Sequence, residues 1–119
     1  MKENLNFDEK FSALGEYYNI SSPEEIKNQI KKNENIFQFL EEIKPYLEES
    51  FSDAEFSLRM NFEPETTHRF IILSVNVSKD RYNNGISDEI RLFDIKTKFL
   101  RNDLNLFHEV LVFPGRKNV

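Results

Sequence analysis

The sequence contains no cysteine and no tryptophan, and it has only three glycines among 119 residues. Without cysteine the chain can form no disulfide, no thiolate nucleophile and no cysteine-based zinc or iron–sulfur site. The glycines do not form a phosphate-binding loop, and the G-x-S-x-G pattern of serine hydrolases is absent. These absences argue against the common nucleotide-binding and nucleophile-based enzymes.

Long hydrophobic segments are also missing. No apolar run approaches the roughly 20 residues needed to span a membrane. The first ten residues are mostly polar and lack the hydrophobic core of a signal peptide. We therefore expect a cytoplasmic protein that contacts no membrane, and the lack of cysteine agrees with a reducing compartment.

Positive charge is in short supply, because 16 Lys and Arg residues stand against 21 Asp and Glu residues, for a formal net charge of −5. Nonspecific nucleic-acid binding depends on Lys and Arg that neutralise phosphates, so nucleic acid is not an expected partner. Acidic residues concentrate between Glu41 and Glu55, where Lys44 is the only base. Such a ridge usually provides solubility, and a partner that used it would be basic.

Aromatic residues are plentiful, with 12 Phe and 4 Tyr, and they should build much of the core. Three amphipathic helices are predicted in the N-terminal half. The first covers residues 7–18, where apolar residues recur at spacings of three and four. The second begins at Ser22-Pro23-Glu24-Glu25, which offers a capping box and a proline at the first helical position. The third covers 36–47, and Pro45 predicts a kink or division one residue before it.

The period changes to two in the C-terminal half. Residues 54–60 and 70–77 alternate as strands with one wet face, and the polar turn 63–67 predicts that they form a β-hairpin. A further helix is predicted from Ser87 to about Arg101, and a third strand over residues 106–113. The residues predicted to be mainly buried are Leu40, Ile43, Leu47, Phe56, Leu58, Ile71, Leu73, Val75, Ile90, Phe93, Val110 and Val112.

These elements indicate the α+β class: N-terminal helices are followed by a small three-stranded ββαβ sheet with a crossover helix on one face. We favour pairing of the third strand with the first, which makes the sheet wholly antiparallel. Pairing with the second would make a parallel βαβ unit and explain the continuous apolar run at 70–73. We expect one domain over residues 1–119, with 1–6 and 115–119 frayed.

Polar loops supply the only candidate ligand sites. His68 and His108 lie in different elements, so we expect no metal site, no catalytic triad and no cofactor. Carboxylates beside an imidazole in the hairpin loop can exchange protons or hold a ligand, and a second polar loop follows the second strand. Ordinary solvated loops are the simpler explanation of both. The candidate ligand-binding residues are Glu63, Glu65, His68, Arg69, Asp80 and Tyr82.

One face of the sheet is a candidate interface. Alternation places polar and apolar side chains together on its outer face, and such mixed surfaces often bind proteins. The candidate interface residues are Arg59, Phe70, Ile72 and Ser74. The alternative is that the N-terminal helices cover this face and make it part of the core.

Two functions fit these observations. The first is a noncatalytic protein-binding or regulatory module, such as an inhibitor or antitoxin, whose partner is an unidentified protein or a further copy of the chain. The second is a small enzyme or ligand-binding subunit with a polar site between the hairpin loop and the strand-to-helix loop at 80–84. We favour the first because the chain is small and acidic and lacks catalytic motifs.

The net charge leads to a test of whether the protein binds nucleic acid. At physiological ionic strength the protein should show no salt-sensitive affinity for mixed-sequence DNA or RNA. The acidic chain has too few unopposed Lys and Arg side chains to displace the counterions of the nucleic-acid phosphates. Fluorescence anisotropy with labelled oligonucleotides measures this. Micromolar binding that weakens steeply with added salt contradicts the expectation.

Overall fold

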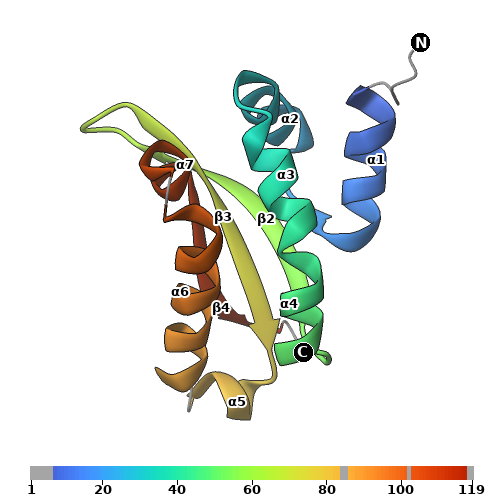
Figure 1. Cartoon of the computed structure of the whole chain (residues 1–119), viewed down its shortest axis with the longest axis vertical. Coiled ribbons are helices and arrows are strands. Elements are labelled where there is room, and N and C mark those ends of the chain that lie inside the picture. Colours follow the sequence, from blue (N-terminus) through green and yellow to red (C-terminus); the bar gives the residue numbers. More distant parts are fainter. Residues whose placement is uncertain (1–6, 84–85, 102, 118–119) are drawn as a thin grey trace.

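The computed structural model describes residues 7–83, 86–101 and 103–117 (Figure 1). Helices and strands follow one another along the chain as α1 (Phe7–Tyr17), β1 (Asn19–Ile20), α2 (Pro23–Lys32), α3 (Asn35–Glu42), α4 (Lys44–Ser50), β2 (Glu55–Glu63), β3 (His68–Val77), α5 (Lys79–Asn83), α6 (Ile86–Leu100), α7 (Leu104–Glu109) and β4 (Val110–Arg116). The α+β class predicted from the sequence is confirmed. Among the described residues, no helix is both long and apolar enough to cross a membrane.

The sheet has four strands in the order β1-β2-β3-β4, where three were predicted. The hairpin of β2 and β3 is confirmed, with Phe56 opposite Val75 and Glu63 opposite His68. The preferred position of the last strand is wrong, because β4 pairs in parallel with β3 and not with β2. The short strand β1 pairs with the other edge of β2. No edge of β2 is therefore free for β4, and the wholly antiparallel sheet cannot form.

Both groups of helices pack on the same face of the sheet. The inner face of β2, β3 and β4 is buried together with the apolar residues of α1 to α4, α6 and α7 in one core. Figure 1 shows that both groups cover different parts of this one face, with α3 and α4 along its right-hand part and α6 along its left-hand part. The outer-facing residues of β2 and β3 stay half-exposed or exposed, apart from Ile72. The alternative in which the N-terminal helices cover the outer face is therefore wrong.

The N-terminal helices follow the predicted pattern with one local difference. The division before Pro45 is confirmed, since α3 ends at Glu42 and α4 begins at Lys44. Ser22 does not cap α2, because it adopts a positive φ of 50° and its side chain makes no capping hydrogen bond. The chain enters α2 directly from β1, with the Ser21 N–H bonded to the Leu58 carbonyl at 2.9 Å, and this turn sets the conformation of Ser22.

The C-terminal elements differ more from the predictions. The segment after β3 forms the short helix α5, and residues 104–109 form α7, so the last strand begins at Val110. Fraying from residue 115 is wrong for 115–117, because β4 extends to Arg116 and the Lys117 N–H donates to the Val77 carbonyl at 2.9 Å. Residues 1–6 and 118–119, also predicted to fray, lie outside the described residues.

Helix α6 turns an unexpected face towards the core. Ile90 and Phe93 were predicted to be buried but are 58% and 59% exposed, while the other ten predicted core residues are buried. The buried residues of α6 are Asp88, Leu92, Lys96 and Leu100. Amphipathic helices usually carry charged residues on the solvent side, so the sequence pattern does not predict burial of a stripe that contains Asp88 and Lys96.

Each buried charge on α6 has a specific neighbour. The Asp88 carboxylate accepts hydrogen bonds from Arg81 Nε at 2.8 Å and Arg81 Nη2 at 3.1 Å. Lys96 is 5% exposed, and its Nζ lies 4.1 Å from the ring centroid of Phe107. Burial lowers the pKa of Lys96 to about 8. The aromatic ring favours the ammonium form and offsets part of that burial cost.

The central position of Leu73 provides a test of the core. Leu73 is fully buried on the middle strand β3, so Leu73→Ala should lower the free energy of unfolding by about 2 to 5 kcal/mol through lost apolar transfer and a residual cavity. Urea titration measures the change. A loss below about 0.5 kcal/mol contradicts the placement, because Leu→Ala at a packed site costs several times more.

Lys96 provides a test that depends on pH. Between about pH 8 and 10.5 the unfolded chain keeps a proton that the folded Lys96 has lost, so the contribution of Lys96 to wild-type stability should rise with pH over this range. Lys96→Met removes the buried ammonium and should stabilise the protein near pH 7 by about 1 to 2 kcal/mol. The advantage of Lys96→Met should shrink towards pH 10.5. Urea titrations across this range, with Lys98→Met as the exposed control, measure it; a constant difference contradicts the assignment.

Candidate functional site

The hairpin-loop candidates make local contacts. Glu63 Oε1 accepts a hydrogen bond from Thr66 Oγ1 at 2.7 Å, and Glu65 is exposed. Thr67 has a positive φ of 56°, which completes the turn back into β3. These contacts order the loop, and the two carboxylates remain in solvent.

The basic candidates of this loop also have partners. His68 Nε2 lies 3.2 Å from the His108 carbonyl, and the His68 ring stacks on Phe70. Arg69 Nη1 lies 3.4 Å from Glu25 Oε2 on α2. His68 and Arg69 point to opposite faces of β3, as alternate residues of a strand must. They do not converge on one site.

The second group of candidates lies on α5. Asp80 and Tyr82 are exposed there, and Arg81 between them ties α5 to Asp88 and to the Ser50 carbonyl, which accepts from Arg81 Nη2 at 3.2 Å. The hairpin loop and α5 are at opposite ends of β3 (Figure 1), roughly 30 Å apart for a strand of ten residues. The structure therefore does not bring the two candidate groups together.

The outer sheet face carries the four candidate interface residues as predicted, but they differ in accessibility. Arg59 is exposed, Phe70 is half-buried under the His68 ring, and Ile72 is only 6% exposed. Ser74 Oγ donates to Asn76 Oδ1 at 2.8 Å, and Asn76 Nδ2 donates to Ser57 Oγ at 3.1 Å. This network and the burial of Ile72 leave little apolar surface at Ile72 and Ser74, although Phe113, the neighbour of Ser74 on β4, is exposed on the same face.

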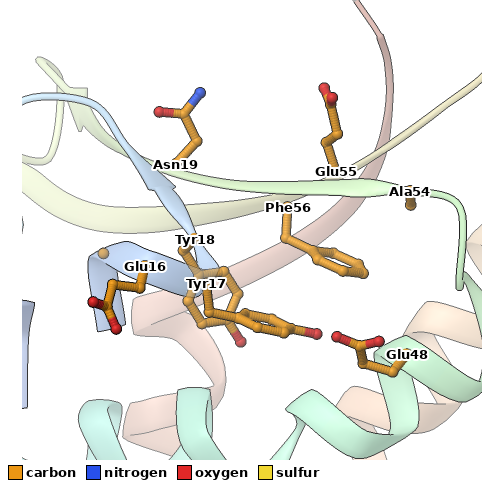
Figure 2. A pocket seen from close by; sticks show the side chains of 9 residues that line it. Glu16, Tyr17, Tyr18, Asn19, Glu48, Ala54, Glu55 and Phe56 are labelled. Carbon is orange, nitrogen blue, oxygen red and sulfur yellow. The ribbon is translucent and has the colours of Figure 1, made fainter. Parts of the chain in front are cut away.

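A cleft of about 520 Å³ lies beside this sheet, between the end of α1, α4 and the start of β2. Figure 2 shows the Tyr17 ring stacked with Phe56, with its hydroxyl directed towards Glu48. Burial and the nearby Glu48 carboxylate raise the pKa of Tyr17. Lys44 Nζ lies 5.0 Å from the Tyr17 ring centroid and also pairs with Glu41.

Apart from the Tyr17 hydroxyl and Glu48, the polar groups of this cleft do not converge. In Figure 2 Asn19 and Glu55 point to the opposite side of their strands from Tyr17, and Glu16 is directed away from Glu48. Small-molecule sites need several polar groups aimed at one ligand. No group of His, Asp and Glu within the described ranges could hold a metal ion. The Tyr17 hydroxyl and Glu48 are directed towards each other, and the remaining polar side chains shown face other directions.

An apolar surface is the more distinctive feature. Ile86, Ile90 and Phe93 line one stripe of α6 and are 75%, 58% and 59% exposed, and Phe113 on the adjacent β4 is 47% exposed. We call these four residues the α6–β4 patch. Ile90, Phe93 and Phe113 line an open cleft of about 360 Å³ together with Glu89, Val112 and Pro114.

Sequence reasoning found the apolar stripe of α6 but placed it on the wrong side. The sequence does contain a signal that one apolar side of α6 is exposed, because the helix has two apolar stripes. One stripe consists of Ile86, Ile90 and Phe93, and the other of Leu92, Ile95 and Phe99. One small core cannot cover both sides of a surface helix. The helix packs through the stripe that contains Leu92 and leaves the other in solvent.

No protein-family model, no curated protein and no solved structure matches this chain.

Proposed function

We propose that the chain is a noncatalytic protein-binding or regulatory module of the cytoplasm, of the kind represented by inhibitors and antitoxins, and that the α6–β4 patch is its binding surface. The orientation of α6 carries this proposal. The helix buries Asp88 and Lys96 while Ile86, Ile90 and Phe93 stay in solvent. The buried side also contains Leu92 and Leu100, so α6 has two apolar sides and the core covers only one of them; the uncovered side is available to a partner.

The size of the patch supports the same function. An aromatic side chain buries about 150 to 250 Å², so four large side chains that are 47% to 75% exposed leave roughly 400 Å² of apolar surface. Patches of this size on monomers are often functional. At about 25 cal/mol per Å², covering it is worth on the order of 10 kcal/mol before the costs of association are subtracted.

The alternative of a small enzyme or ligand-binding subunit has weaker support. Its two polar groups lie at opposite ends of β3, and around the Tyr17 cleft Glu16, Asn19 and Glu55 point away from the Tyr17 hydroxyl and Glu48 (Figure 2). A binding module requires only a surface patch, which α6 and β4 supply.

Site-specific photo-cross-linking tests the proposed surface. A photoreactive side chain at Phe93 should give a covalent adduct with a protein in the source cell, because the patch is covered when the module is bound. The same side chain at Phe62, an exposed phenylalanine on β2, is the matched control and should give none. Adduct masses are read by gel and mass spectrometry. Equal labelling at both positions, or no protein adduct at Phe93, overturns the proposal.

A further inference from the structure

We propose that the α6–β4 patch binds a basic amphipathic helix of another protein. The apolar side of that helix covers Ile90, Phe93 and Phe113. Its Lys or Arg side chains pair with Glu89 and Asp94. This inference rests on the proposed function, since it uses the same surface and names the chemistry of the partner. Three features of the described residues select a helix of this kind: the apolar cleft, the edge of β4 and the charges beside the apolar stripe.

The cleft of the patch has two apolar walls. Ile90 and Phe93 on α6 form one wall, and residues 112–114 of β4 form the other. Five of the six lining residues are apolar, and the sixth is Glu89. Grooves of this kind bind the apolar side of an amphipathic helix through anchors one and two turns apart. A partner helix that lies along α6 can therefore insert its apolar side chains between the two walls.

A strand is a poor partner for this surface, although β4 is an edge strand. The Lys117 N–H bonds to β3, and alternate residues of a strand face the same neighbour, so the even-numbered residues of β4 face the free edge. Among these, Pro114 has no N–H, and the Val110 N–H donates to the Leu106 carbonyl at the end of α7. Proline on an edge is a device against strand addition. A partner helix needs no backbone hydrogen bonds from β4.

The two charges that flank the apolar stripe are both acidic. At about 100° of rotation per residue, Glu89 lies on one side of Ile90 and Phe93, and Asp94 lies on the other. Glu89 and Asp94 are exposed, and neither forms an ion pair with another described residue. Basic side chains of a partner can reach both carboxylates without displacing a neighbour. Charge pairs at the rim of an interface select the partner and its register.

The basic residues of α6 lie away from this acidic rim. Arg91 is at least about 100° around the helix from each residue of the stripe. Lys96 is buried, and Lys98 Nζ lies 4.9 Å from the ring centroid of Tyr46 on α4. Arg101 lies beyond the end of α6. A second copy of this chain is a poor occupant, because it would bring an identical acidic rim against the first.

Synthetic peptides of opposite charge test the proposed partner. The first is a fluorescein-labelled peptide of about 18 residues, with leucines at helical spacing among lysines. The second has glutamate in place of every lysine. Fluorescence anisotropy should give the lysine peptide a Kd in the micromolar range and the glutamate peptide a Kd at least about tenfold weaker. A third peptide, with the composition of the first but alternating leucines, represents a strand and should also bind at least about tenfold more weakly.

Charge reversal separates the acidic rim from the overall charge of the protein. Glu89→Lys combined with Asp94→Lys should weaken binding of the lysine peptide at least about tenfold and strengthen binding of the glutamate peptide. Glu24→Lys combined with Glu49→Lys changes the net charge equally at exposed positions on α2 and α4. This matched control should change either affinity less than about threefold, because salt screens charges outside the contact. Phe93→Ser should weaken binding of both peptides.

The possible results are distinct. Circular dichroism should show that all variants fold, since the altered side chains are exposed. No binding of the lysine peptide, equal binding of the glutamate peptide, tighter binding of the alternating peptide, or an equal loss in the control variant overturns the basic helix as partner. Sedimentation velocity that shows wild-type self-association lost in Phe93→Ser makes a second copy the occupant, which also overturns it.

The cross-linking experiment distinguishes failure of this inference from failure of the proposed function. If the peptides contradict a basic helix but Phe93 still gives a protein adduct, the proposed function stands with a partner of different chemistry. An absence of any protein adduct at Phe93 overturns both proposals.

Discussion

The parallel pairing of β3 with β4 is the constraint on which the rest of the structure depends. A parallel connection has to return the chain to the starting end of the sheet, and α6 provides that return across one face. The N-terminal helices already occupy the same face over β2. Because both groups of helices share one side, the sheet has a single buried face, and β4 becomes an edge strand next to α6.

This one-sided packing explains the unusual composition of the buried stripe of α6. The helix lies at the margin of the core, where its inner side meets α5 at one end and α7 at the other. Asp88 is placed so that Arg81 can bind it with two hydrogen bonds, and Lys96 lies over the Phe107 ring. Pairing lowers the cost of burying each charge, and these contacts tie the short helices α5 and α7 to α6.

The same packing separates two kinds of surface. The cleft at Tyr17 is the larger, yet its carboxylates point in different directions and it offers no common position for a ligand (Figure 2). The α6–β4 patch consists of large apolar side chains on two adjacent elements. Affinity between proteins comes from covering such side chains, with polar neighbours selecting the partner.

Local patterns in the sequence determined most elements of this protein. The three-and-four spacing of apolar residues predicts the N-terminal helices, Pro45 predicts their division, and strict alternation predicts the hairpin and the faces of Phe56, Leu73 and Ile72. These features follow from the geometry of a single helix or strand, so nearby residues suffice to predict them.

Tertiary structure alone decided which elements meet. The position of β4 depends on whether another segment already occupies the edge of β2, and β1 is a strand of two residues with no sequence signal of its own. The choice between the two apolar stripes of α6 depends on partners for Asp88 and Lys96 that lie 7 and 11 residues away in the chain, on α5 and α7. The surface of Ile90 and Phe93 is exposed because those distant contacts determine the rotation of the helix, and a periodic pattern contains no information about that rotation.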